Sequence, residues 1–192
     1  ILYFTCSNGL LNFQARLGGS WRSYATIRNR WENTSWTHIA VTYDRSLQSG
    51  NLKFYVNGTV DSQHDNKGLL TNAGVYNLAI GWAYGFGTGR GYGGLMDEVR
   101  VWNFSRTQPE IESTRMRILN DTECANANLV GYWRFDEGTG DTTQDYSIYN
   151  HITQLGLSPY DPAWVVHCTC PLVPEFSLIS AMLIFMTATT FI

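Results

Sequence analysis

The sequence predicts an all-β protein built from two packed antiparallel sheets, with one short helix on the surface. Eighteen Gly and 14% aromatic residues, against only 15% charged residues, favour strands joined by tight turns, because glycine supplies positive φ and aromatic side chains fill pleated surfaces. Apolar residues also recur with a period of two, as in half-buried strands. With 192 residues and 44% hydrophobic content, the chain is long enough for one principal domain.

The clearest strands form a predicted hairpin region in the first third of the chain. Apolar residues alternate over residues 39–43 and again over residues 52–56, and residues 44–50 supply the turn between them. Asn57-Gly58 then predicts a type I′ turn, in which both central residues need positive φ. A further strand is expected to begin at Thr59.

A glycine-rich segment follows another predicted strand, "VYNLAIGW", over residues 75–82. Residues 81–94 hold seven glycines, but a dinucleotide-binding fingerprint must leave a strand and open a helix. This segment leads into another strand-like run instead. It predicts a surface loop that displays four aromatic side chains, which are Trp82, Tyr84, Phe86 and Tyr92.

The segment "LMDEVRVW", residues 95–102, predicts a strand with a charge on its apolar side. Leu95, Val99 and Val101 share one face, and Asp97 has the same parity. A carboxylate among aliphatic side chains must find donors or a cation, because leaving it unpaired costs several kcal/mol. Asp97 is therefore the most informative charged residue of the chain.

The single predicted helix and the last clear strand follow. Thr107 and Glu110 match a capping box, which predicts a short helix over residues 109–119. "LVGYWRF", residues 129–135, predicts a strand that ends at the Gly-Thr-Gly turn of residues 138–140. One helix among five or six strands supports the sandwich architecture.

The C-terminal tail is predicted to be a hydrophobic helix. Residues 176–192 carry no charge, and as a helix they would span roughly 25 Å, which is short for a bilayer. We expect a transmembrane or sorting-signal segment, with a buried core helix or strand as the alternative. Residues 167–175 are then a linker, and residues 1–166 form the domain, incomplete at its N-terminus, on the extracellular face of the cell surface.

The net charge argues against a nucleic-acid-binding protein, and the cysteine spacing argues against a structural zinc site. A formal net charge of −3 without a basic run argues against a nucleic-acid partner. Cys6, Cys124, Cys168 and Cys170 lack the CxxC spacing of a structural zinc site. A disulfide bond is expected instead in an exported protein, and Cys6 with Cys124 is one open pairing.

Four segments in order, "WTHIAVTYD", "LKFYVNG", "LAIGW" and "GGLMDEVRVWNFSRTQPEI", resemble the laminin-G-like (concanavalin A-like) jelly-roll domains related to pentraxins. "LVGYWRFDEGTGDTTQDYSIYNH" is similar to an element that commonly accompanies them. The resemblance implies a jelly-roll module of secreted or surface proteins that recognises glycans or other proteins, often with bound calcium.

The resemblance also assigns calcium ligands. It places Asp97 in the family's Asp-Glu pair, and Asp145 and Asn150 in its Asp-x-Ser-Gly-Asn loop, where hard oxygen donors suit calcium. This chain has Ile148-Tyr149 where the family pattern has Gly-Asn. The alternative is that Asp97 and Asp145 bind backbone amides and fix turns.

No motif predicts an enzyme. Glucanases of this fold class need two carboxylates about 5 to 10 Å apart, whereas the adjacent Asp97 and Glu98 point to opposite faces of a strand. His38 has no nucleophile motif nearby. We therefore expect a non-catalytic adhesion module for a glycan or an extracellular protein, tethered to the membrane by its tail, with the loop aromatics at residues 82–92 contacting the ligand. The alternative is a ligand-free structural or accessory domain of a larger surface protein or secreted carbohydrate-active enzyme.

Overall fold

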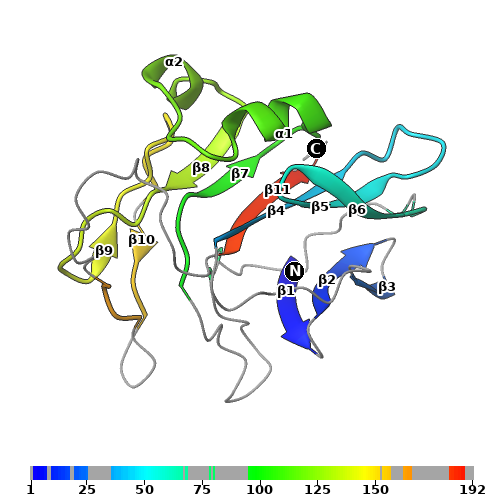
Figure 1. The fold of residues 1–192 in the computed structure, drawn as a ribbon, viewed down its shortest axis with the longest axis horizontal. Helices are drawn as coiled ribbons and strands as arrows, with labels where there is room; N and C mark the ends of the chain where they lie inside the picture. Colours follow the sequence, from blue (N-terminus) through cyan, green and yellow to red (C-terminus); the bar gives the residue numbers. More distant parts are fainter. Residues whose placement is uncertain are drawn as a thin grey trace.

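The computed structural model describes residues 2–7, 10–17, 20–25, 36–66, 68, 78, 80, 95–151, 153–156, 162–165 and 182–188 of the chain. These residues form a six-stranded, a three-stranded and a two-stranded sheet with two short helices (Figure 1). Every strand pairing among them is antiparallel except the two made by the last strand. The mostly antiparallel β architecture confirms the predicted class and is consistent with a jelly roll.

The six-stranded sheet is the centre of the fold. Its strand order is β6-β5-β4-β11-β7-β8. The strands are β4 (Thr37–Tyr43), β5 (Leu52–Val56), β6 (Thr59–His64), β7 (Val99–Trp102), β8 (Leu129–Trp133) and β11 (Met182–Ala188). Strands β4, β5, β7 and β8 were expected from the alternation of apolar residues, and β6 was expected from the turn that precedes it.

The β5–β6 connection confirms the predicted type of turn. Asn57 has φ 52° and Gly58 has φ 82°, as a type I′ turn requires. The Asn57 side-chain oxygen accepts a hydrogen bond from the backbone N–H of His38, at 2.9 Å. The turn is thereby fixed to the start of β4.

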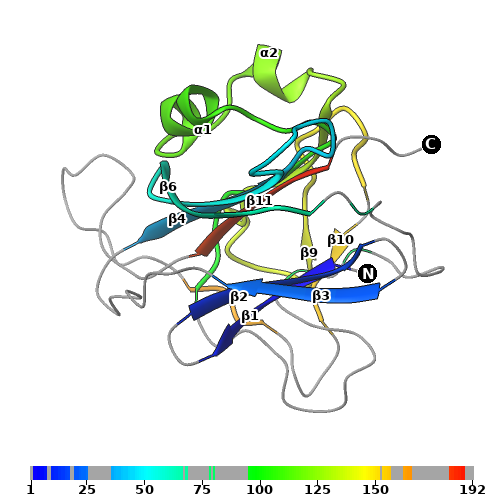
Figure 2. The ribbon, with the colours of Figure 1, turned by 90° about the vertical axis from the view of Figure 1, so that its right-hand side faces the viewer.

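A second sheet packs on one side of the first. Strands β1 (Leu2–Ser7), β2 (Leu10–Leu17) and β3 (Ser20–Ala25) form an antiparallel sheet, which lies below the six-stranded sheet in Figure 2. Tyr24 of β3 contacts His64 of β6, with ring centroids 4.9 Å apart. The two sheets therefore form the predicted sandwich, although strands β2 and β3 were not predicted from the sequence.

Two helices cover the opposite side of the six-stranded sheet (Figure 2). Helix α1 (Gln108–Thr114) has the predicted capping box of Thr107 and Glu110 but ends five residues earlier than expected, at Thr114 rather than residue 119. Helix α2 (Asp121–Cys124) has a second capping box, formed by Asn120 and Glu123, that the sequence reading missed. The helices bury a core cluster on this face of the sheet, made of Ala40, Tyr55, Trp102, Ile111, Leu119, Leu129 and Tyr132.

The central strands are consequently buried on both faces. In β4, every residue from His38 to Tyr43 is buried, and in β7, Val99, Arg100 and Trp102 are all buried. A strand with one solvated face would bury only alternate residues. The positions that alternation assigns to solvent in these strands therefore face the helices or the second sheet.

The structure does not confirm the predicted C-terminal helix. Met182–Ala188, within the predicted segment 176–192, form β11, which pairs in parallel with β4 and with β7. An uninterrupted apolar segment is compatible with a helix and with a fully buried strand. Here β11 provides backbone hydrogen-bond partners for the edges of two neighbouring strands. Among the described residues, no helix has the length and apolarity needed to span a membrane.

Two further predictions concern cysteines and boundaries. Cys124 is a free thiol in the structure, so the Cys6–Cys124 pairing is not formed. Residues 168 and 170 lie outside the described residues. The boundaries of the domain, linker and tail at residues 166 and 175 stay predictions.

Candidate functional site

The segment after β8 is fixed to the edge of the main sheet by one buried carboxylate. Asp145 is 1% exposed, and its Oδ1 accepts the backbone N–H of Tyr132 and of Ser147, each at 2.9 Å. Asp145 also forms an isolated antiparallel bridge with Trp133. The segment therefore covers the outer edge of β8, which would otherwise present unpaired backbone groups.

The second oxygen of Asp145 closes the loop on itself. Asp145 Oδ2 accepts the backbone N–H of His151 at 3.0 Å and the hydroxyl of Ser147 at 2.9 Å, and it lies 2.5 Å from His151 Nδ1. Burial alone would raise the pKa of Asp145, but the hydrogen bonds from His151, Ser147 and Tyr132 outweigh it and lower the pKa. The carboxylate is thus ionised and holds residues 145–151 in one conformation.

This loop presents two apolar side chains to solvent. Ile148 is 55% exposed and Tyr149 is 48% exposed. The Tyr149 hydroxyl donates to the carbonyl of Ala127 at 2.8 Å, and its ring stacks on that of His151, with centroids 5.8 Å apart and planes 28° apart. We call Ile148, Tyr149 and His151 the Tyr149 platform. Ile148 and Tyr149 occupy the two positions at which the chain departs from the family pattern.

Asp97 lies on the other side of β8 from Asp145. It precedes β7, and β7 pairs with the edge of β8 opposite the Asp145 bridge. Its Oδ1 accepts the backbone N–H of Glu98 at 2.9 Å. Burial raises the pKa of Asp97 to about 7, and the nearby charges of Glu98 and Asp136 act in the same direction. The carboxylate of Asp97 was expected to need a hydrogen-bond donor, and a backbone amide provides one.

The three residues that the resemblance assigns to calcium do not fit one site as they lie here. Strand β8 separates Asp97 from Asp145, and the oxygens of Asp145 already accept hydrogen bonds from several donors. Asn150 is exposed with φ 46°. Calcium needs six to eight oxygen ligands, and no group of three or more His, Cys, Asp or Glu in the described parts of the chain could hold a metal ion. Calcium binding stays a prediction, and the contacts favour the alternative that Asp145 fixes a turn.

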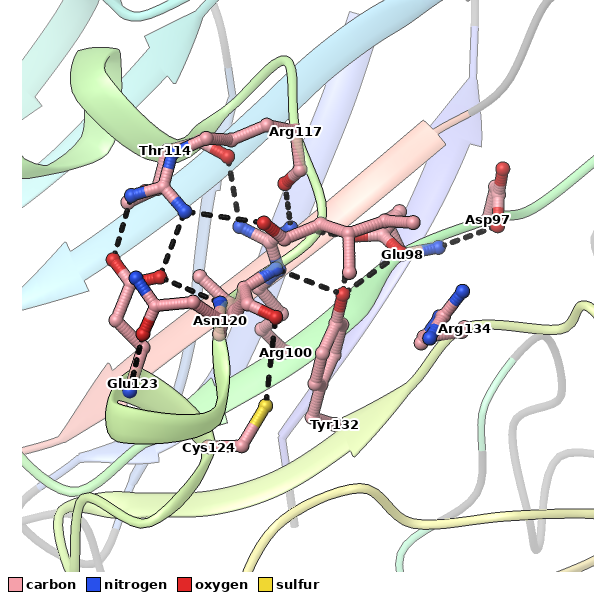
Figure 3. Close-up of polar contacts among 12 residues, drawn as sticks. Asp97, Glu98, Arg100, Thr114, Arg117, Asn120, Glu123, Cys124, Tyr132 and Arg134 are labelled. Atoms are coloured by element: carbon pink, nitrogen blue, oxygen red, sulfur yellow. Dashed lines mark hydrogen bonds and ion pairs between the residues drawn. The ribbon is translucent and has the colours of Figure 1, made fainter. Parts of the chain in front are cut away.

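A buried ion pair, which the sequence reading missed, attaches the helices to the sheet (Figure 3). Arg100 of β7 is fully buried and forms an ion pair with Glu98, whose carboxylate also accepts the hydroxyl of Tyr132 at 2.7 Å. Glu98 immediately precedes β7, and Arg100 is the second residue of that strand. The sequence carries the signal as opposite charges two residues apart, but no ion pair was predicted from it.

Arg100 also terminates helix α1. Its Nη1 donates to the carbonyl of Thr114 at 2.9 Å, and its Nη2 donates to the carbonyl of Arg117. The last carbonyls of a helix lack intrahelical partners and carry partial negative charge, and α1 has no basic residue in its own last turn. The guanidinium therefore supplies from the sheet the cation that the helix end lacks.

The connection between the helices is held by a second ion pair. Arg117 makes two hydrogen bonds to the carboxylate of Glu123, at 2.6 and 2.7 Å. The hydrogen bond with Arg117 lowers the pKa of Glu123 to about 2, although burial acts against it. Asn120 caps α2 by accepting the N–H of Glu123 at 3.0 Å. Hydrogen bonds among Arg117, Asn120 and Glu123 thus hold the connection between the two helices.

The predicted ligand-binding aromatics cannot be placed against this geometry. Trp82, Tyr84, Phe86 and Tyr92 all lie outside the described residues. Their role stays a prediction. The described chain offers the Tyr149 platform as its exposed aromatic surface, and the sequence reading had treated Ile148-Tyr149 only as a departure from a loop pattern.

The strand pairings of the described residues define a mostly antiparallel β-sandwich with two short helices. The family model for the concanavalin A-like lectin/glucanases superfamily matches residues 1–112, which is more than half of the chain, and the chain belongs to this superfamily. No curated protein matches it significantly.

A solved structure supports the same assignment. The chain resembles a proposed carbohydrate-binding protein from Bacteroides ovatus ATCC 8483, with 27% sequence identity and a TM-score of 0.56. The match covers 77% of this chain and 40% of the Bacteroides protein. The chain therefore spans less than half the length of that protein.

Proposed function

We propose that this chain is a non-catalytic glycan-binding module of an extracellular surface protein. The observation that carries the proposal is the similarity, at 27% identity over 77% of the chain, to a proposed carbohydrate-binding protein with the same fold. Membership of the lectin/glucanase superfamily agrees with it. Attachment to the cell surface through residues 176–192 belongs to the proposal and rests on the apolar composition of that segment.

Three of the described carboxylates, those of Glu98, Asp136 and Asp145, are engaged in structural contacts, which favours binding over hydrolysis. A glycosidase needs one acid and one base or nucleophile that both face a bound sugar. Glu98 is buried against Arg100 and Tyr132, and Asp145 is buried against backbone donors. Asp136 is exposed but paired with Arg134 at 2.6 Å. Each of these three carboxylates thus has a structural partner.

A glycan array probed with the fluorescently labelled chain tests the proposal. We expect concentration-dependent binding to a defined subset of glycans, and no release of reducing ends when the best binder is incubated with the chain. A thermally unfolded sample of the same chain is the control for non-specific adsorption. Absence of glycan binding would contradict the proposal, and binding confined to a panel of extracellular matrix proteins would favour the protein-ligand alternative. Release of reducing ends would show that the chain is an enzyme.

A further inference from the structure

The Tyr149 platform is an exposed apolar surface on a loop, residues 145–151, that hydrogen bonds hold in one conformation. The strongly exposed large hydrophobic residues among the described positions are Leu47, Leu78, Met116, Ile148, Tyr149 and Val165. Single exposed apolar residues are common on protein surfaces and do not by themselves indicate a binding site. Ile148 and Tyr149 differ from the others because they are adjacent and because Tyr149 is the aromatic member of the set.

The Tyr149 ring is held in place at both ends. Its hydroxyl donates to the carbonyl of Ala127, and its backbone N–H donates to the Ser147 hydroxyl at 3.3 Å. Its ring lies against the imidazole of His151, which is itself fixed by Asp145. An ordered ring loses little conformational entropy when a ligand binds, and a ligand can therefore use its contact energy for affinity.

The groups around the platform suit the hydroxyls of a neutral sugar. Asn126 and Asn128 flank Ala127, the residue that accepts from the Tyr149 hydroxyl, and both are exposed. Asn150 follows Tyr149 and is also exposed. Carboxamides both donate and accept hydrogen bonds, as a polyhydroxylated ligand requires. The side-chain carboxylate nearest to the platform, that of Asp145, is buried.

We propose that the Tyr149 platform binds a neutral pyranose unit of a glycan by stacking the apolar C–H face of the sugar on the Tyr149 ring. An aromatic ring with a polar surround provides the apolar contact and the hydrogen bonds that such a ligand needs. The proposal rests on the glycan-binding function proposed above and names a site for it. That site does not include Trp82, Tyr84, Phe86 or Tyr92, the aromatic residues predicted from the sequence to bind the ligand.

Three variants of the full chain test this site by titration calorimetry with the neutral oligosaccharide that binds best on the array. Tyr149→Ala removes the ring, and Tyr149→Leu removes it while keeping apolar bulk. We expect both to weaken binding about tenfold or more, which corresponds to about 1.4 kcal/mol. Met116→Ala, at a side chain of similar exposure (47%), is the control and should bind as the wild type does. Near-UV circular dichroism verifies that each variant is folded.

Each outcome distinguishes the site from the function. Loss of affinity in both Tyr149 variants with the control unchanged supports the site. Wild-type affinity in a folded Tyr149→Leu variant overturns the site and leaves the glycan-binding function intact, with the loop at residues 82–92 as the next region to test. If the wild-type chain binds no glycan, both the site and the function are wrong.

Discussion

The most direct test of the loop architecture is Asp145→Asn. The substitution keeps Oδ1, which accepts from Tyr132 and Ser147, but replaces Oδ2 with an NH₂ group that faces the N–H of His151 and the hydroxyl of Ser147. One partly buried N–H then loses its acceptor and meets a second donor. Loss of a buried acceptor costs about 1–3 kcal/mol, and loss of the imidazole contact adds about 1 kcal/mol.

We therefore expect Asp145→Asn to lower the free energy of unfolding by about 3 kcal/mol, or the melting temperature by about 6 to 12 °C for a chain of this size. Urea unfolding followed by circular dichroism at pH 7 measures the loss. Asp141→Asn, at an exposed aspartate of the same connection, is the control and should stay within about 0.5 kcal/mol of the wild type.

The pH dependence of the stability difference between the wild type and Asp145→Asn provides a second test. Hydrogen bonds hold the pKa of Asp145 below its ordinary value, so the ionised group stabilises the fold above about pH 4. That contribution is lost as the pH falls through the folded-state pKa. The difference between wild type and Asp145→Asn should accordingly shrink in acid. An Asn variant as stable as the wild type at pH 7, or a deficit that does not change with pH, would show that the ionised Asp145 does not hold this loop.

Three further predictions concern the sheet. Burial, aided by the charge of Glu98, raises the pKa of Asp97 to about 7, so the free energy of unfolding of the wild type should fall as the pH rises from about 4 toward 7. The fall is at most about 4 kcal/mol, and solvent screening of the partly exposed carboxylate makes it smaller. Urea unfolding across this range should show no such fall for Asp97→Asn. Arg100→Met leaves the Glu98 carboxylate buried without its cation and should cost about 3–5 kcal/mol, partly recovered when Glu98→Gln is added; a single variant within 1 kcal/mol of wild type would show that the pair matters little. Gly131→Ala places a Cβ 2.3 Å from the Trp133 ring and should cost about 1–3 kcal/mol with a changed near-UV spectrum, whereas an unchanged spectrum would mean that the ring does not lie over this glycine.

Local rules predicted the parts of the fold that short segments determine. The Asn57-Gly58 turn depends on the φ preferences of two residues, and it formed as expected. The capping box of Thr107 and Glu110 involves four consecutive residues, and it also formed. In both cases the interacting groups are neighbours in sequence, so that no knowledge of the tertiary structure is needed.

The parts that depend on distant packing were not predicted. No partner was predicted for Glu98 or Arg100, because the helices that cover them come later in the chain. The role of Asp145 depends on the backbone of Tyr132, thirteen residues away. The β11 strand depends on two neighbours that are distant in sequence, because backbone pairing, rather than the apolar run itself, determines its structure.

Some features of the candidate site were anticipated from the sequence, and others were not. Asp97 was singled out as a carboxylate that must find donors, and the alternative to calcium at Asp145 was that it fixes a turn. Both carboxylates accept backbone amide hydrogens. The exposure of Tyr149 was not expected, because the sequence alone does not show that an aromatic residue in a polar loop lacks a core to enter. Only the fixed loop around it makes that exposure informative.

The measurement that bears most directly on the account is an NMR titration of the ¹⁵N-labelled chain with an oligosaccharide selected on the array. A glycan-binding module with its site on the loop after β8 should show saturable shifts of amide signals centred on residues 145–151, with the sugar recovered unchanged. Absence of any saturable shift, or appearance of hydrolysis products in the tube, would contradict the account.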